Sequence, residues 1–106
     1  MSRATALEAL LAQGQDTALL RYSLGNEYLN AGDSAAAVAH LMHAVRHDPD
    51  YSAAWKMLGK AYVALGQTDQ ARGAFEQGIA AASRKGDKQA EKEMQVFMRR
   101  LLRKPT

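Results

Sequence analysis

The fold is decided by the stretch Trp55-Lys56-Met57-Leu58-Gly59-Lys60-Ala61-Tyr62. On a helix, its large apolar residues and Gly59 recur every three or four positions, so they form one stripe along one side. Gly59 leaves a gap in this stripe, where a paired helix can approach closely. A glycine inside a helix costs roughly 1 kcal/mol relative to alanine, so its presence here indicates a packing role.

The pattern occurs twice, 34 residues apart. The later copy continues into a second helix, where Ala71 and Phe75 form the facing stripe. Shifting it back gives an earlier copy in the same order: Arg21, Leu24, Gly25, Tyr28, Ala37 and Leu41. Two copies in register are much harder to obtain by chance than one. The chain is therefore predicted to contain a repeated helix-turn-helix unit.

These residues resemble the tetratricopeptide repeat, a helix-turn-helix unit of about 34 residues with the pattern W-x2-L-G-x2-Y, then a small and an aromatic residue. The segment from Ala18 to Ser83 is similar to two consecutive repeats, assigned to residues 18–51 and 52–85. The chain departs from the family at Arg21, where tryptophan is usual, and at Ser83, where proline is usual. The resemblance implies an all-α fold, in which antiparallel helix-turn-helix repeats stack as a right-handed superhelix.

Helices are also predicted on both sides of the repeats, and residues 1–106 are interpreted as a single domain. Residues 1–14 are expected to cover the open apolar flank of the first repeat. The apolar face of this covering helix consists of Ala6, Leu7, Leu10 and Leu11. Residues 87–104 are predicted to form a capping helix. In it Met94 takes the place of the glycine and should block the close approach of a partner helix.

Glycines and polar residues mark the elbow of each repeat. Gly32 and Gly66 are expected to take the left-handed conformation that ends a helix. After them, Asp33-Ser34 and Thr68-Asp69 offer side chains that can cap the next helix. Both repeats are thus predicted to turn at the same place.

The composition narrows the class of protein. Hydrophobic residues make up 47% and charged residues 24%, which is ordinary for a globular chain. The absence of cysteine excludes disulfides and thiolate metal sites. No stretch reaches the roughly 18 apolar residues that a membrane span requires. Glu8 and Gln13 interrupt the N-terminal apolar run, so no signal peptide is predicted. A cytoplasmic location is expected, unless an upstream leader was removed.

The net charge of +3 is unevenly distributed. Between residues 15 and 51, five acidic residues outnumber two arginines, whereas from residue 83 onward eight basic residues outnumber three acidic ones. Such a dipole can steer an acidic partner or favour weak head-to-tail self-association, and both effects depend on salt. A solvated surface that keeps the domain soluble explains the same charges.

Residues that could carry chemistry are few. His40, His43 and His47 lie on one side of a predicted helix, but no carboxylate lies at a helical offset among them. They are expected on the solvated convex side, and neither a metal site nor a cofactor is predicted. The sequence has no G-x-S-x-G elbow and no phosphate-binding glycine loop, so an enzyme is not predicted.

The last helix is predicted to end in a cluster of cations: Arg99, Arg100, Arg103 and Lys104. Cations at this end interact favourably with the helix dipole. An acidic protein surface is the other explanation. Nucleic-acid binding is not predicted, because it normally requires a broader basic face with interleaved aromatic residues.

The resemblance implies that the first helix of each pair lines a concave groove. The residues expected to bind a peptide there are Tyr22, Asn26, Leu29, Asn30, Lys56, Lys60 and Val63. An aromatic ring supplies apolar area, carboxamides can bond a peptide backbone, and lysines attract carboxylates. The same residues could also be merely solvated or covered by the terminal helices.

The resemblance implies a non-catalytic protein-protein interaction module that holds a partner peptide or helix in this groove. The partner would be another protein, with acidic character favoured by the lysines. The alternatives are a weak homo-oligomer, in which the basic last helix meets the acidic first repeat of another copy, and an accessory subunit that regulates an enzyme.

Overall fold

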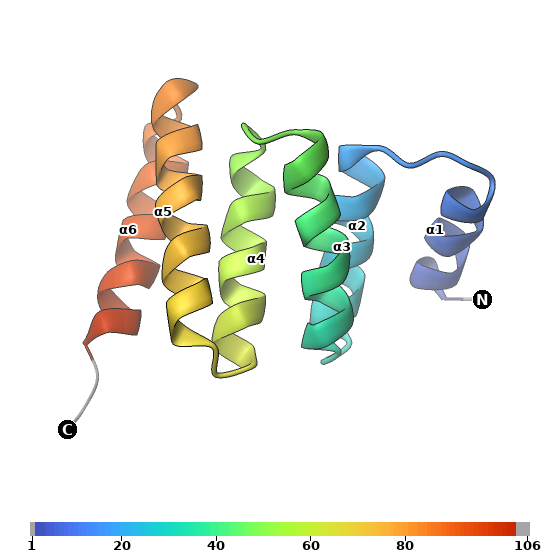
Figure 1. The fold of residues 1–106 in the computed structure, drawn as a ribbon, viewed down its shortest axis with the longest axis horizontal. Helices are drawn as coiled ribbons and strands as arrows, with labels where there is room; N and C mark the ends of the chain where they lie inside the picture. The colour runs from blue at the N-terminus through green and yellow to red at the C-terminus, as the bar shows by residue number, and fades with distance from the viewer. Residues whose placement is uncertain (1, 104–106) are drawn as a thin grey trace.

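The computed structural model describes residues 2–103, which form a row of antiparallel helices (Figure 1). Within this range the helices are α1 (Arg3–Ala12), α2 (Ala18–Asn30), α3 (Ser34–His47), α4 (Ser52–Ala64), α5 (Thr68–Arg84) and α6 (Lys88–Leu102). The described part contains no strand. The array measures 45 × 32 × 18 Å. It is therefore about two helix diameters thick, since a helix with side chains is about 10 Å wide.

Close pairing of α2 with α3, and of α4 with α5, depends on a glycine in each first helix. A Cβ atom on Gly25 would lie 2.7 Å from Cδ2 of Leu41, and one on Gly59 would lie 2.7 Å from Cδ1 of Phe75. Real Cβ atoms do not approach other carbons so closely. Leu41 and Phe75 are almost fully buried. The predicted glycine gaps are thus confirmed, and a side chain from the paired helix fills each one.

A third contact of this kind joins α5 to α6. A Cβ atom on Gly78 would lie 3.2 Å from Cε of Met94 and still closer to its sulfur. Met94 is fully buried. In this pair the glycine is on α5, and the unbranched methionine side chain is flexible enough to enter the gap. No helix follows α6 among the described residues, so the blocking of a later paired helix by Met94 stays a prediction.

The helix ends follow the predicted elbows in most respects. Gly32 and Gly66 have φ angles of 85° and 73°, in the left-handed region that favours glycine. The Asp33 carboxylate accepts a hydrogen bond from the Ala36 N–H at 3.1 Å and caps α3. The prediction of a cap at Thr68-Asp69 is wrong, because α5 begins at Thr68 and its N-cap residue makes no side-chain bond.

The first helix, α1, covers its neighbour only in part. It contacts α2, and none of its residues is buried. Leu7 and Leu11 are half-buried, whereas Ala6 and Leu10 remain exposed. The predicted covering role is therefore only partly fulfilled.

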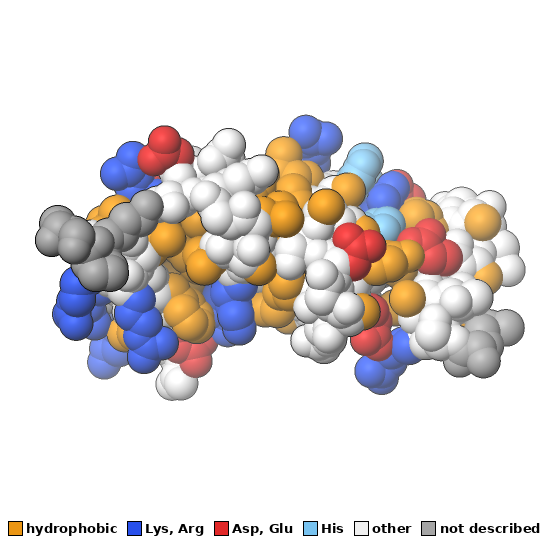
Figure 2. All heavy atoms as spheres, turned by 90° about the horizontal axis from the view of Figure 1, so that it is seen from below, with side chains coloured by type: hydrophobic (Ala, Val, Ile, Leu, Met, Phe, Trp, Pro, Cys, Tyr) orange, Lys and Arg blue, Asp and Glu red, His pale blue; other side chains and the backbone are white. Residues whose placement is uncertain are grey.

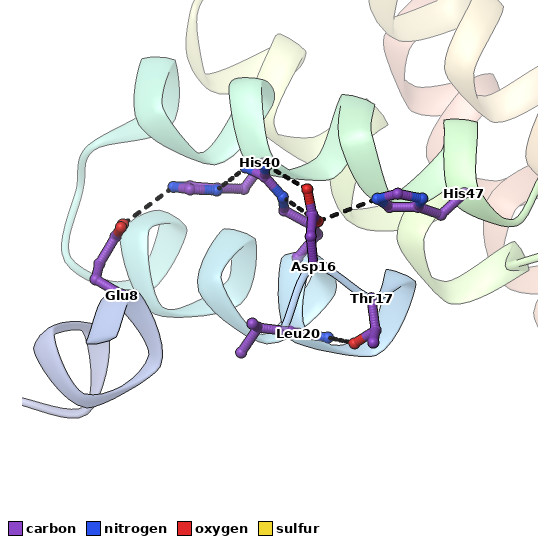
Figure 3. A network of polar contacts seen from close by, with 7 residues as sticks. Glu8, Asp16, Thr17, Leu20, His40 and His47 are labelled. Atoms are coloured by element: carbon purple, nitrogen blue, oxygen red, sulfur yellow. Dashed lines mark hydrogen bonds and ion pairs between the residues drawn. The ribbon is translucent and has the colours of Figure 1, made fainter. Parts of the chain in front are cut away.

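Polar contacts hold α1 in place, and Figure 3 shows the one between Glu8 and His40. The Tyr28 hydroxyl donates a hydrogen bond to Glu8 at 3.0 Å, and Glu8 also lies 3.3 Å from Nε2 of His40. The guanidinium of Arg3 lies 3.3 Å from the Glu27 carboxylate. Because Tyr28 and Glu27 are on α2 and His40 is on α3, these contacts tie α1 to both helices of the next pair.

Arg21, which stands where the family usually has tryptophan, is the centre of a polar network. Its guanidinium donates two hydrogen bonds to Asp16, at 2.8 and 2.9 Å, and a third to Nδ1 of His40 at 3.1 Å. Asp16 also lies 3.0 Å from Nε2 of His47 (Figure 3). Since guanidinium can only donate, Nδ1 of His40 accepts, and the Nε2–H of this tautomer points to Glu8.

For His40, this network corrects the prediction that the histidines face solvent on the convex side, whereas His47 is exposed, as predicted. Only 14% of the His40 side chain is exposed, and its ring stacks on Tyr28 with centroids 5.4 Å apart. Carboxylates do reach His40 and His47, but they come from α1 and from the loop before α2. Among the described residues, no group of three or more His, Cys, Asp or Glu side chains could hold a metal ion.

Replacing Gly59 with alanine should lower the free energy of unfolding by about 1 to 3 kcal/mol, because the added methyl group overpacks the contact with Phe75. Gly73 is the matched control, since it lies inside α5 and a Cβ atom there would meet nothing within 4 Å. Gly73→Ala should raise the free energy of unfolding by up to about 1 kcal/mol through helix propensity. Urea unfolding followed by circular dichroism measures both, and a change of the same sign in the two variants would contradict the packing argument.

The contribution of Asp16 to stability should depend on pH. Hydrogen bonds from Arg21, assisted by His47, hold the pKa of the Asp16 carboxyl well below its ordinary value. The contribution is therefore complete above the ordinary pKa of about 4 and is lost as the pH falls towards the lower folded-state pKa. Asp16→Asn should lower the Tm at pH 7, and its difference from wild type should shrink in acid.

The control for this measurement is Asp69→Asn. Asp69 is 90% exposed at its side chain and lies 3.6 Å from Arg72. Exposed ion pairs contribute little to stability, so this variant should keep a Tm close to that of wild type at pH 7. An Asp16→Asn variant with the same Tm as wild type at every pH would show that the network does not stabilise the fold.

Candidate functional site

Alternate helices form one layer of the molecule. Besides its neighbours along the chain, α3 and α5, helix α4 contacts both α2 and α6, so α2, α4 and α6 lie side by side. We call their exposed side the inner face, formed by α2, α4 and α6. All seven residues of the predicted binding groove lie on α2 or α4, and α6 adds a third wall that the prediction did not include.

A pocket of about 430 Å³ opens between α4 and α6. Its lining residues are Lys60, Val63, Phe75, Phe97, Arg100, Leu101 and Arg103. The rings of Phe75 and Phe97 stack with centroids 5.8 Å apart and give the pocket an aromatic wall. Val63 is 46% exposed, so the apolar surface continues to the opening. We call this cavity the α4–α6 pocket.

Cations surround the apolar interior of this pocket. The Lys60 ammonium lies 5.4 Å from the centroid of the Phe97 ring, which is a cation–π distance. Arg100 and Arg103 are exposed, and no carboxylate within residues 2–103 forms an ion pair with either of them or with Lys60. Lys104, the last member of the predicted basic cluster, lies outside the described residues. Figure 2 shows basic side chains gathered around apolar ones at the end formed by α5 and α6.

The sequence predicts that Lys56 attracts a carboxylate of a bound peptide, but in the structure it already binds a carboxylate of the chain. Its ammonium donates a hydrogen bond to Glu93 of α6 at 3.0 Å. This bond from Lys56 also holds the pKa of the Glu93 carboxyl below its ordinary value. Lys56 therefore joins α4 to α6, and of the two predicted lysines only Lys60 borders the pocket.

Asn26 and Asn30 border a different cavity, of about 470 Å³, between α1 and α2. The Oδ1 atom of Asn26 is buried and has no hydrogen-bond partner among the described residues. Arg3 and Leu7 of α1 form the opposite side of this cavity. The structure thus places the two asparagines beside α1 and does not bring them to Lys60 and Val63 in one pocket.

The other two predicted groove residues take part in packing. The ring of Tyr22 lies 4.9 Å from the ring of Tyr51, which precedes α4, and the two planes are inclined by 36°. Leu29 is half-buried and packs against the central hydrophobic core. Both side chains therefore support the join between neighbouring helix pairs as well as the inner face.

Sequence reasoning missed the contribution of α6 to the inner face. The sequence predicts a capping helix over residues 87–104 with Arg100 and Arg103 at its basic end, and its apolar stripe, which includes Phe97 and Leu101, is given no binding role. The three-four spacing shows that such residues share a side, but it does not show which apolar residues of an end helix remain open. The basic residues next to that stripe were the available signal.

No helix among the described residues has the length and apolar character needed to cross a bilayer.

Comparisons with known proteins agree with this architecture. A model of the tetratricopeptide repeat family matches residues 28–87. A TPR repeat-containing protein of Pseudomonas aeruginosa is 57% identical over 100 residues, which cover 94% of this chain and 95% of that protein.

Solved structures give the same result. A protein of Bordetella parapertussis with a known solution structure is 48% identical, with a TM-score of 0.84 over 97% of this chain and 90% of that one. A tetratricopeptide repeat domain protein of Salinibacter ruber is 31% identical, with a TM-score of 0.75 over 82% of this chain and 88% of that one. The resemblance noted in the sequence is thus confirmed, and the chain belongs to the tetratricopeptide repeat family.

Proposed function

We propose that this chain is a non-catalytic interaction module that binds a segment of another protein on the inner face, with the α4–α6 pocket as the main contact. Proteins of this family generally act as protein-interaction modules. The observation that carries the proposal is an open pocket with apolar and aromatic walls on this face. Apolar pockets with a few polar groups at the edge are the usual sites of recognition.

The predicted groove residues enter this proposal with different roles. Lys60 and Val63 belong to the pocket, while Asn26 and Asn30 are suited to hydrogen bonds with the backbone of a bound segment near α1. Tyr22 and Leu29 shape the surface between them. Lys56 contributes indirectly, because its bond to Glu93 holds α6 against α4.

Head-to-tail self-assembly is less well supported than binding of another protein. The five acidic residues between positions 15 and 51 all have partners within the chain. Asp16 bonds to Arg21, Glu27 lies against Arg3, and Asp50 lies against Arg84. Asp33 and Asp48 accept hydrogen bonds from backbone N–H groups. The acidic surface available to a second copy is therefore reduced.

The proposal is tested by affinity capture from cells that express the protein. The bait variant Lys60→Glu with Val63→Glu changes the inner face. The matched control, Arg72→Glu with Ala80→Glu, makes the same charge change on exposed residues of α5. The proteins recovered by wild type should be retained by the α5 variant and lost by the inner-face variant. Equal recovery by both variants would show that the inner face is not the binding surface.

Light scattering at low and high salt tests the self-assembly alternative. Electrostatic association between copies should give a mass that rises with protein concentration at low salt and falls when salt screens the charges. We expect a monomer at both salt concentrations. A salt-sensitive dimer would favour the alternative.

The cytoplasmic location is also a prediction, and cell fractionation checks it.

A further inference from the structure

We propose that the α4–α6 pocket selects an acidic peptide segment that carries a large apolar side chain. The apolar side chain would enter the pocket, and its neighbouring carboxylates would meet the cations at the opening. This inference rests on the proposed function, because it specifies the partner of the same surface.

The shape and lining of the pocket support the apolar anchor. Its volume of about 430 Å³ falls in the range of about 300 to 1,000 Å³ that is typical of ligand pockets. Phe75 is buried and fixed in the gap at Gly59, so the inner wall is rigid. A preformed wall lowers the entropic cost of binding. Phe97 and Leu101 are only half-buried and leave apolar area for a ligand to cover.

The charge around the pocket supports the acidic flanks. Lys60 comes from α4, whereas Arg100 lies in the last turn of α6 and Arg103 directly follows this helix, so cations border the opening from two sides. None of the three forms an ion pair with a carboxylate of the described residues. Carboxylates of a ligand can therefore pair with them without competing with a carboxylate of residues 2–103. A basic segment would be repelled, so the charges supply selectivity as well as attraction.

The opposite end of the inner face has a different character. The cavity between α1 and α2 is lined mainly by polar side chains, including Ser23, Asn26 and Asn30. It offers hydrogen bonds and little apolar area. The apolar anchor of a bound segment therefore has its place between α4 and α6, and the more polar part of the segment lies towards α2.

The test is selection from a phage-displayed library of short random peptides on the full chain at low salt. The enriched peptides are synthesised with a fluorophore, and their affinity is measured by fluorescence anisotropy. Peptides rich in Asp and Glu around one Leu, Phe, Ile or Trp are expected. Enrichment of basic peptides, or no enrichment over an uncoated surface, would overturn the proposal.

Neighbouring arginines on α6 provide a matched pair of variants. Arg100 lines the pocket, whereas Arg99 lies on another side of α6, beside Gln95 and Met98. Arg100→Glu should weaken binding of the selected peptides about three- to tenfold at low salt. Arg99→Glu makes the same charge change and should have a much smaller effect. Equal loss in the two variants would indicate attraction by net charge alone and would refute a specific pocket.

Further measurements separate this inference from the proposed function. Peptides that lose affinity with Asn26→Ala but not with Arg100→Glu would refute the pocket and leave binding on the inner face intact. Selected peptides that are unaffected by any inner-face variant would refute both. Arg100-dependent binding to vesicles containing phosphatidylserine, without binding of acidic peptides, would reassign the pocket to anionic lipid. The thermal melt of each variant checks that it is folded.

Discussion

The contact between a glycine on one helix and a buried side chain on the next is the constraint on which the array depends. Leu41, Phe75 and Met94 each fill such a gap, and all three are among the largest fully buried side chains. A helix-interior glycine costs roughly 1 kcal/mol, whereas burying one of these side chains contributes about 1.5 to 3 kcal/mol. The gain exceeds the cost in every pair. The same contact fixes Phe75 at the wall of the α4–α6 pocket, so the packing of the repeat and the shape of the candidate site have one origin.

The first repeat replaces an aromatic contact with a polar one. In the second repeat the Trp55 ring packs against the hydrophobic core, and its indole N–H donates to the carbonyl of Pro49 at 2.8 Å. At the corresponding place Arg21 binds Asp16 with two hydrogen bonds and reaches His40. His40 in turn lies next to Glu8, which draws α1 onto the repeat. The substitution therefore exchanges apolar burial for a polar connection to the N-terminal helix.

Features that depend on neighbouring residues could be predicted from the sequence, whereas those that depend on distant segments could not. The helix pairs, the gaps at Gly25 and Gly59 and the cap at Asp33 follow from local spacing. The environment of His40 does not follow from local spacing, because the carboxylate beside it belongs to Glu8 of α1. The α4–α6 pocket was missed for the same reason: Lys60 was recognised, but Phe97 could be placed beside it only when the position of α6 was known. Helical periodicity states which residues share a side and leaves open what faces them.

The spacing of the glycine contacts has a consequence for how the chain folds. In all three contacts, the glycine and the residue whose side chain fills the gap beside it are 16 residues apart. Closing so short a loop carries a small entropic cost, and topologies rich in local contacts fold rapidly. Each helix pair can therefore form its central contact without waiting for the rest of the chain, and the array can grow by adding one hairpin to the next from any starting point.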